Sequence, residues 1–140
     1  MSEELKRAGL LLRTVAKILD FIIIAVLVQI PKAGFFAGLA YLLIGDALLD
    51  GRSFGKALIK IRVVAADTNT PCTLRDSILR NITFGIGFLL YYIPLFGWIF
   101  IMIISVLEFI VLLGSRNGMR IGDEIANTIV IESSKIKQEA

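Results

Sequence analysis

The apolar residues of this 140-residue chain are gathered into a few long runs, and these runs constrain the fold more than any other feature. Hydrophobic residues make up 56% of the chain and charged residues only 19%, whereas soluble domains usually contain about 45–50% and about 25% respectively. A clustered apolar excess of this kind is typical of membrane spans. We therefore expect a membrane protein, and a single domain is the natural expectation at this length.

Two prolines, Pro31 and Pro94, divide the apolar runs into four predicted spans. The apolar segment that contains Pro94 would be about 60 Å long as one helix, which is about twice the thickness of a bilayer core. Two helices that turn at this proline fit a bilayer better. The four spans are expected at residues 5–30, 34–49, 74–93 and 97–113.

Two short stretches, residues 59–66 and 127–132, alternate apolar and polar residues in the manner of strands. A small sheet in a membrane protein has to lie outside the bilayer, and pairing would place both stretches on the same side. An even number of spans then separates them, which favours four spans over three. Shorter signals mark two helix starts: Ser53 is placed to cap a turn, and Thr73 with Asp76 resembles a capping box.

Basic residues follow the second and fourth predicted spans, in the loop around Lys56 and in the tail around Arg120. Such residues mark the cytoplasmic side of a membrane protein. The sequence therefore predicts an all-α bundle of four transmembrane helices with a small two-stranded cytoplasmic β element. It also predicts a multi-pass protein of the plasma membrane with both termini in the cytoplasm.

The residues needed for common enzymatic chemistry are scarce. Histidine is absent and Cys72 is the only cysteine, which excludes a Cys/His zinc site and a Cys–His nucleophile within one chain. The net charge of +3 comes without a basic patch interleaved with aromatic residues and without a Gly-rich phosphate loop. We expect the lipid bilayer as the main partner, and no enzyme, cofactor, metal site or nucleic acid.

Several ionisable residues fall at predicted membrane depth, where an unpaired charge costs several kcal/mol. Each is therefore a candidate for binding an ion or a proton, or for a buried polar cluster. Arg13 and Asp20 are seven residues apart and share one face of a helix. The candidates are Arg13, Asp20, Asp46 and Glu108, with Arg80 and Asp123 near the cytoplasmic rim.

Each candidate near the first span has a structural alternative. Lys17 is early enough in the span to snorkel to the headgroups. Asp20 lies deeper and should face the bundle, with Arg13, Lys17 or Arg80 as its basic partner. A salt bridge that locks the first helix to its neighbours and a role in transport are both open for it.

The two other carboxylates at membrane depth have alternatives as well. Asp46 reads most simply as a solvated helix end, although it could reach the same polar cluster. Glu108 could carry a proton with a raised pKa, or it could make a single hydrogen bond between helices, and the hydrogen bond is favoured.

Four motifs in order along the chain resemble those of the RDD family of small membrane proteins, which is named for one arginine and two aspartates. By this resemblance Arg13 and Asp20 are the first two signature residues and Asp123 is the second aspartate. Gly122 departs from the family pattern, which often has His or another residue there. The motifs are Arg13-x-x-Ala16-x-x-x-Asp20, the stretch from Phe54 to Val64, Arg75 with Arg80-Asn81, and the stretch from Gly122 to Ile131.

The resemblance implies a polytopic helical protein, and transport that includes sodium–proton exchange has been suggested for the family. One hypothesis is therefore a cation/proton transporter or transporter subunit for Na⁺ or H⁺ that works as a homo-oligomer, because four short spans leave little room for a transport site. The alternative is a structural or accessory membrane protein in which Arg13, Asp20 and Asp123 form a packing lock. The surroundings of Asp20 discriminate between the two.

Overall fold

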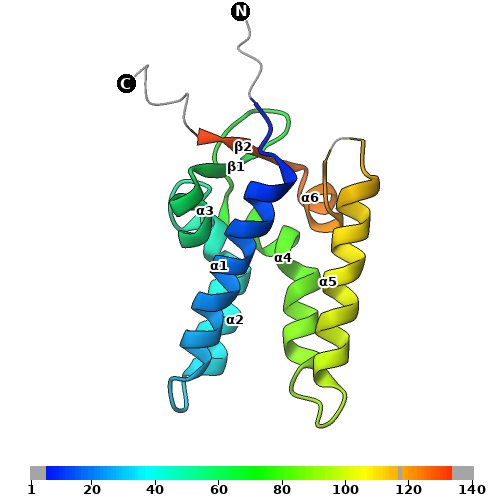
Figure 1. Cartoon of the computed structure of the whole chain (residues 1–140). Helices are drawn as coiled ribbons and strands as arrows, with labels where there is room; N and C mark the ends of the chain where they lie inside the picture. Colours follow the sequence, from blue (N-terminus) through cyan, green and yellow to red (C-terminus); the bar gives the residue numbers. More distant parts are fainter. Residues whose placement is uncertain (1–5, 117, 134–140) are drawn as a thin grey trace, which may run out of the picture.

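The computed structural model describes residues 6–116 and 118–133, and its helices, strands and 3₁₀ turn all lie within them. The longer helices extend in one direction, while the strands and the two shortest helices gather at one end of them (Figure 1). In chain order the elements are α1 (Leu10–Val28), α2 (Gly34–Ile44), the 3₁₀ turn η1 (Gly45–Ala47), α3 (Phe54–Ile59), β1 (Ile61–Ala65), α4 (Leu74–Leu90), α5 (Gly97–Gly114), α6 (Ile121–Ala126) and β2 (Thr128–Glu132).

The first helix begins at Leu10, later than the start predicted near residue 5, because the residues before it pair with the sheet. The N–H of Ala8 donates to the carbonyl of Val130 at 2.9 Å, and the N–H of Glu132 donates to the carbonyl of Lys6 at 3.0 Å. A backbone that is paired with a strand in this way cannot also make helical hydrogen bonds. The segment before α1 is therefore a third, short partner of the small sheet.

Local signals begin the helices at the points that the sequence predicts. The Ser53 hydroxyl accepts the N–H of Lys56 at 3.3 Å, which caps α3. At α4, Thr73 and Asp76 each accept the backbone N–H of the other, which is a complete capping box. The helix α6, by contrast, was not predicted, and it begins after Arg120, whose N–H donates to the Asp123 carboxylate at 3.2 Å.

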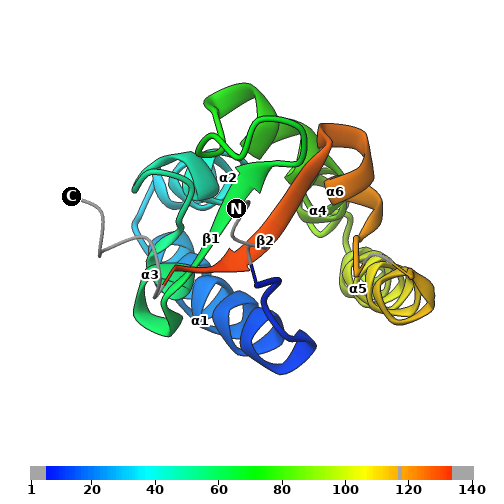
Figure 2. The ribbon, with the colours of Figure 1, turned by 90° about the horizontal axis from the view of Figure 1, so that it is seen from above.

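The two strands form the predicted two-stranded sheet. They are antiparallel, and Val63 lies opposite Val130 in the register. Both valines are buried, and they pack with Ala16 of α1 in one apolar cluster. The sheet therefore covers one end of the helices, as the view along the bundle shows (Figure 2).

Among the residues described, α5 is the one helix that is both long and apolar enough to cross a membrane. The other long helix, α1, carries Arg13, Lys17 and Asp20, and α4 has only 17 residues. The protein is thus mostly helical with a small two-stranded sheet, and the four-span bundle stays a prediction.

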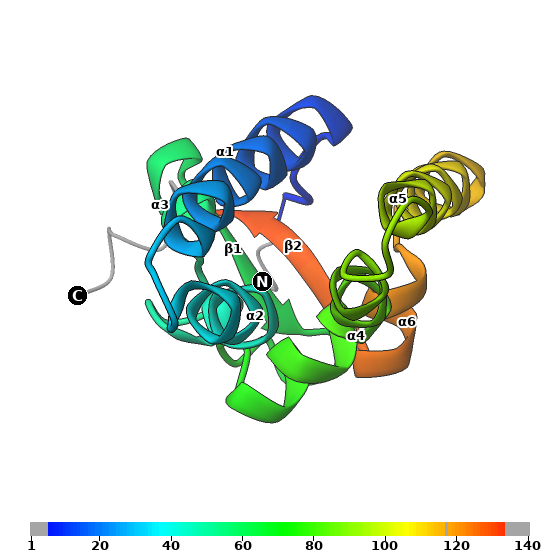
Figure 3. The same ribbon diagram turned by 90° about the horizontal axis from the view of Figure 1, so that it is seen from below.

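The helices divide into a packed group and one outlying member. The helices α1, α2 and α4 enclose an apolar cluster that includes Ile24, Tyr41 and Phe88. In contrast, α5 packs mainly against α4, and α1 packs mainly against α2 and α3. The view from the opposite end shows α1 and α5 apart from each other, with α4 lying next to α5 (Figure 3).

Candidate functional site

Asp123 of α6 forms ion pairs with residues of two other helices, α1 and α4. It lies in the first turn of α6 with only 1% of its surface exposed. Its carboxylate forms an ion pair with Arg13 of α1, whose Nη2 lies at 2.6 Å, and with Arg80 of α4, whose Nη2 lies at 2.7 Å. Nη2 of Arg120 lies farther away, at 3.7 Å. The candidates Arg13, Arg80 and Asp123, which are far apart in the sequence, thus meet in one cluster.

The charges around Asp123 determine its protonation. Burial by itself would raise the pKa of this carboxyl group. The positive charges of Arg80, Arg120 and Arg13 outweigh that effect and lower the pKa from 3.8 to about 2. Asp123 is therefore ionised throughout the physiological range.

Gly122, the departure from the family pattern, has a packing role. A Cβ atom at this position would collide with the backbone carbonyl of Arg80. Only glycine allows α6 to approach the backbone of α4 this closely. That approach places Asp123 beside the Arg80 guanidinium.

Asp20 is buried and accepts several hydrogen bonds, but its basic partner is not among the residues that the sequence predicts. It accepts the Tyr41 hydroxyl at 2.8 Å, the Ser53 hydroxyl at 2.6 Å and the N–H of Gly55 at 3.0 Å. Its ion-pair partner is Lys56 of α3, with Nζ at 3.7 Å. The expectation of Arg13, Lys17 or Arg80 as partner was wrong, because α3 folds back against α1 and brings its own lysine.

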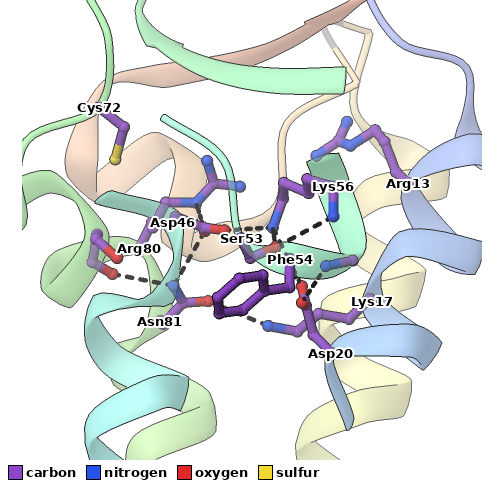
Figure 4. Close-up of polar contacts among 12 residues, drawn as sticks. Arg13, Lys17, Asp20, Asp46, Ser53, Phe54, Lys56, Cys72, Arg80 and Asn81 are labelled. Carbon is purple, nitrogen blue, oxygen red and sulfur yellow. Dashed lines mark hydrogen bonds and ion pairs between the residues drawn. The ribbon is translucent and has the colours of Figure 1, made fainter. Parts of the chain in front are cut away.

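Asp46 lies in the same polar cluster as Asp20. The simpler interpretation, a solvated helix end, was wrong, and the structure shows the alternative that the sequence left open. The helix α2 ends at Ile44, and the following 3₁₀ turn directs Asp46 inward, where it is 3% exposed. Its carboxylate contacts Lys56 Nζ, lies 3.3 Å from Arg80 Nε, and accepts Asn81 Nδ2 at 3.2 Å. Figure 4 shows these side chains converging from η1, α3 and α4, with Asp20 of α1 beside them.

Lys17 also lies inside this cluster, so the prediction that it snorkels to the headgroups was wrong. Its Nζ donates to Oδ1 of Asn81 at 3.2 Å. The ammonium group also lies over two aromatic rings, 4.7 Å from the centre of Phe84 and 5.3 Å from that of Phe21. The amide oxygen and the two ring faces replace part of the hydration that the Lys17 ammonium group would have in water.

Glu108 stands apart from the ion pairs. It is 2% exposed, and its Oε1 accepts the hydroxyl of Thr83 at 2.5 Å. This is the single hydrogen bond between helices that the sequence interpretation favoured. Its other oxygen has no hydrogen-bond partner among residues 6–116 and 118–133.

The ion pairs form one continuous chain of alternating charge. In order it runs through Arg13, Asp123, Arg80, Asp46, Lys56 and Asp20. We call these six residues the charge network. Sequence reasoning found five of them as site candidates. It missed Lys56, which it placed in a basic loop and in the family-like stretch from Phe54 to Val64 but not among the site candidates. The available signal was its place in that stretch, which resembles a motif of the family.

The space beside the network carboxylates is very small. The cavity bordered by Asp20, Asp46 and Asn81 has a volume of about 10 Å³. A cavity needs about 10–15 Å³ to hold a single water molecule, so a hydrated ion does not fit there. Within the described part of the chain, no group of three or more Cys, Asp or Glu side chains is placed to hold a metal ion.

Comparison with known proteins identifies the family. The sequence profile of the RDD family matches residues 33–127, which is more than half of the chain and includes Asp46, Arg80 and Asp123. The matched segment begins after α1, so the assignment of Arg13 and Asp20 as signature residues stays a prediction. No curated protein and no solved structure shows a significant match. The chain thus belongs to the RDD family, whose members are generally membrane proteins.

Proposed function

We propose that this protein is a structural or accessory membrane protein in which the charge network locks the helices to the small sheet. The proposal rests on the observation that the Asp20 carboxylate already has a full set of partners. Three hydrogen bonds and one ion pair occupy its carboxylate. A cation could bind to it only after these interactions were broken, and they are strong because the acceptor is charged and buried.

The balance of charge around the site supports the same proposal. Among the residues that the structure describes, five cationic side chains of this region lie beside four carboxylates, so the region as a whole disfavours uptake of another cation. The cationic residues are Arg13, Lys17, Lys56, Arg80 and Arg120, and the acidic ones are Asp20, Asp46, Glu108 and Asp123. The pairs of Arg13 and Arg80 with Asp123, and of Asp20 with Lys56, join elements that are distant in sequence, which is what a packing lock requires.

Ion flux into proteoliposomes tests the proposal through Asp20→Asn. We expect sodium and proton flux with the wild-type protein to equal that of empty vesicles, and the variant to be the same. The variant should instead lower the melting temperature, because an amide cannot accept all the donors that surround Asp20. Flux in the wild type that disappears in Asp20→Asn would refute the lock and support coupling through this carboxylate.

Glu108 supports a second candidate function, which is transport of Na⁺ or H⁺ by a homo-oligomer. It is buried, it has one unpartnered oxygen among the described residues, and it borders a cavity of about 160 Å³. An ionisable residue buried at membrane depth beside a cavity is a candidate for a place on an ion pathway. Loss of flux in Glu108→Gln, with flux retained in Asp20→Asn, would favour this candidate over the lock.

We further propose four membrane spans with both termini in the cytoplasm of a plasma-membrane protein. The described ends of the chain support an even number of spans, because Lys6 and Glu132 form a salt bridge at 3.4 Å. The turns after α1 and after α4 lie at the opposite end of the molecule from the sheet (Figure 1). Apolar side chains such as Val26 and Met102 face outward from the helices, as they would toward lipid.

Accessibility of introduced cysteines tests this topology in intact cells. A membrane-impermeant maleimide should label Ala33→Cys and Phe96→Cys, at the two distant turns, and should label Thr68→Cys beside the sheet only after the cells are opened. The native Cys72 provides the blank, because it is buried and burial raises the pKa of its thiol to about 12. Labelling of Thr68→Cys in intact cells would contradict the proposed orientation.

A further inference from the structure

A cavity of about 160 Å³ opens between α1 and α5 near the sheet end of the molecule, and its polar lining is mainly cationic. Among the described residues, Glu108 is the one carboxylate that borders it. Asp20, Asp46 and Asp123 do not border it, and each forms an ion pair with a basic residue. The cavity is thus suited to an anion. The cationic residues that line it are Arg13, Lys17, Lys56, Arg80 and Arg120.

Arg80 gives independent support for an anionic ligand. The side chain is 1% exposed, and its Nε and Nη2 face Asp46 and Asp123. Within residues 6–116 and 118–133, none of its three guanidinium nitrogens has a hydrogen-bond partner. A buried donor without an acceptor is costly, and a phosphate oxygen is an acceptor that guanidinium groups bind well.

A second cavity continues from the first and is apolar. It has a volume of about 310 Å³ and is bordered by residues such as Ala25, Phe88 and Ile104. The two cavities share Phe21 and Phe84, so the apolar space begins where the cationic space ends. Together they form a groove between α1 and α5 with a cationic head near the sheet and an apolar tail toward the distant turns. We call it the α1–α5 groove.

We propose that the α1–α5 groove binds an anionic phospholipid, with its phosphate among the cationic residues and one acyl chain along the apolar cavity. A free phosphate would use only the cationic part and would leave the apolar part empty. A helix from a second copy of the chain would fill the apolar part and leave the Arg80 guanidinium without a hydrogen-bond acceptor. A phospholipid satisfies both parts at once, and the bilayer supplies it from the side.

Native mass spectrometry of the full-length protein in detergent, titrated with phosphatidylglycerol or phosphatidylcholine, tests the proposal. The wild type should bind phosphatidylglycerol about tenfold more tightly, since each basic residue near a lipid headgroup adds severalfold to the affinity. Lys17→Gln, which can still donate to Asn81, should weaken phosphatidylglycerol binding by about fivefold and phosphatidylcholine binding less, because choline already offsets the charge of that phosphate. Ala25→Trp should weaken both lipids by filling the apolar cavity.

Val26→Trp is the matched control, because this neighbour of Ala25 is 66% exposed and lies outside the groove. It should bind both lipids as the wild type does. Phosphatidylglycerol binding that is unchanged in both Lys17→Gln and Ala25→Trp would overturn the proposal. Displacement of the lipid by inorganic phosphate, with Ala25→Trp unaffected, would overturn it in favour of a small anion. A wild-type dimer that Ala25→Trp dissociates, without bound lipid, would overturn it in favour of a second copy.

Discussion

Replacing Asp123 by Asn is expected to lower the free energy of unfolding by about 3–5 kcal/mol, which is the usual effect of breaking a buried ion pair. The amide has nearly the same size and can still accept the N–H of Arg120. It cannot neutralise the guanidinium groups of Arg13 and Arg80, which would be left buried with too little counter-charge. Denaturant unfolding in detergent, followed by far-UV circular dichroism, measures the change.

Asp50→Asn is the matched control, because it makes the same chemical change at an exposed position. It should alter the free energy of unfolding by less than about 0.5 kcal/mol. The double variant of Asp123→Asn with Arg80→Met should be more stable than the sum of the two single effects predicts. Equal stability of Asp123→Asn and Asp50→Asn would show that the ion pairs around Asp123 contribute nothing to the fold.

Asp123→Asn should also change the response to acid. The folded protein holds the pKa of Asp123 at about 2, below the ordinary value of 3.8. A lowered pKa means that the stabilisation is complete above about pH 4 and is lost as the pH falls through about pH 2. The wild type should therefore lose stability across this interval, and the variant should lose less because it has no carboxyl group there to protonate.

The elements that could be predicted from the sequence are those encoded by local signals. The caps at Ser53 and Thr73 and the alternation of apolar residues in the two strands are properties of a few adjacent residues. The pairing of Lys6 and Ala8 with β2 could not be predicted in this way, because it joins residues more than a hundred positions apart. The short helix α6 was also missed, since its six residues show little periodicity and precede a clear strand pattern.

The charged site shows the same division between local and distant information. The cost of charge in a membrane identifies Asp20 and Asp46 as unusual, but it does not show which partners compensate them. Lys56 lies in a segment whose basic composition suggests only that a loop faces the cytoplasm. Its inward direction results from the packing of α3 against α1, where a Cβ on Gly55 would collide with the backbone of Ala16. The ion-pair partners within the network therefore depend on tertiary packing and could not be predicted from the sequence.

Three cationic residues, Arg13, Lys56 and Arg80, belong both to the charge network and to the lining of the α1–α5 groove. Arg80 directs two of its nitrogens to Asp46 and Asp123 and has a third without a partner among the described residues. The carboxylates fix the position of the guanidinium group and lower the cost of burying it. They do not use all of its hydrogen-bonding capacity. A structural lock and a lipid site are thus compatible in one arrangement, because the first preorganises the donors that the second needs.

Lys56→Met is the variant expected to damage this arrangement as strongly as Asp123→Asn does. Lys56 is 5% exposed and is the cation that lies between Asp20 and Asp46. Methionine preserves most of its shape and leaves the two carboxylates with less positive charge nearby. We expect a loss of about 3–5 kcal/mol in the free energy of unfolding, measured by the same denaturant titration.

The control and the double variant decide whether charge is the cause. Lys6→Met removes an exposed lysine whose salt bridge with Glu132 should contribute no more than about 1 kcal/mol. If the loss in Lys56→Met comes from the uncompensated carboxylates, adding Asp46→Asn should cost less than it does in the wild type, with a coupling energy of about 0.5–3 kcal/mol. Strictly additive effects would mean that Lys56 stabilises α3 through packing alone, and the charge network would then end at Asp46.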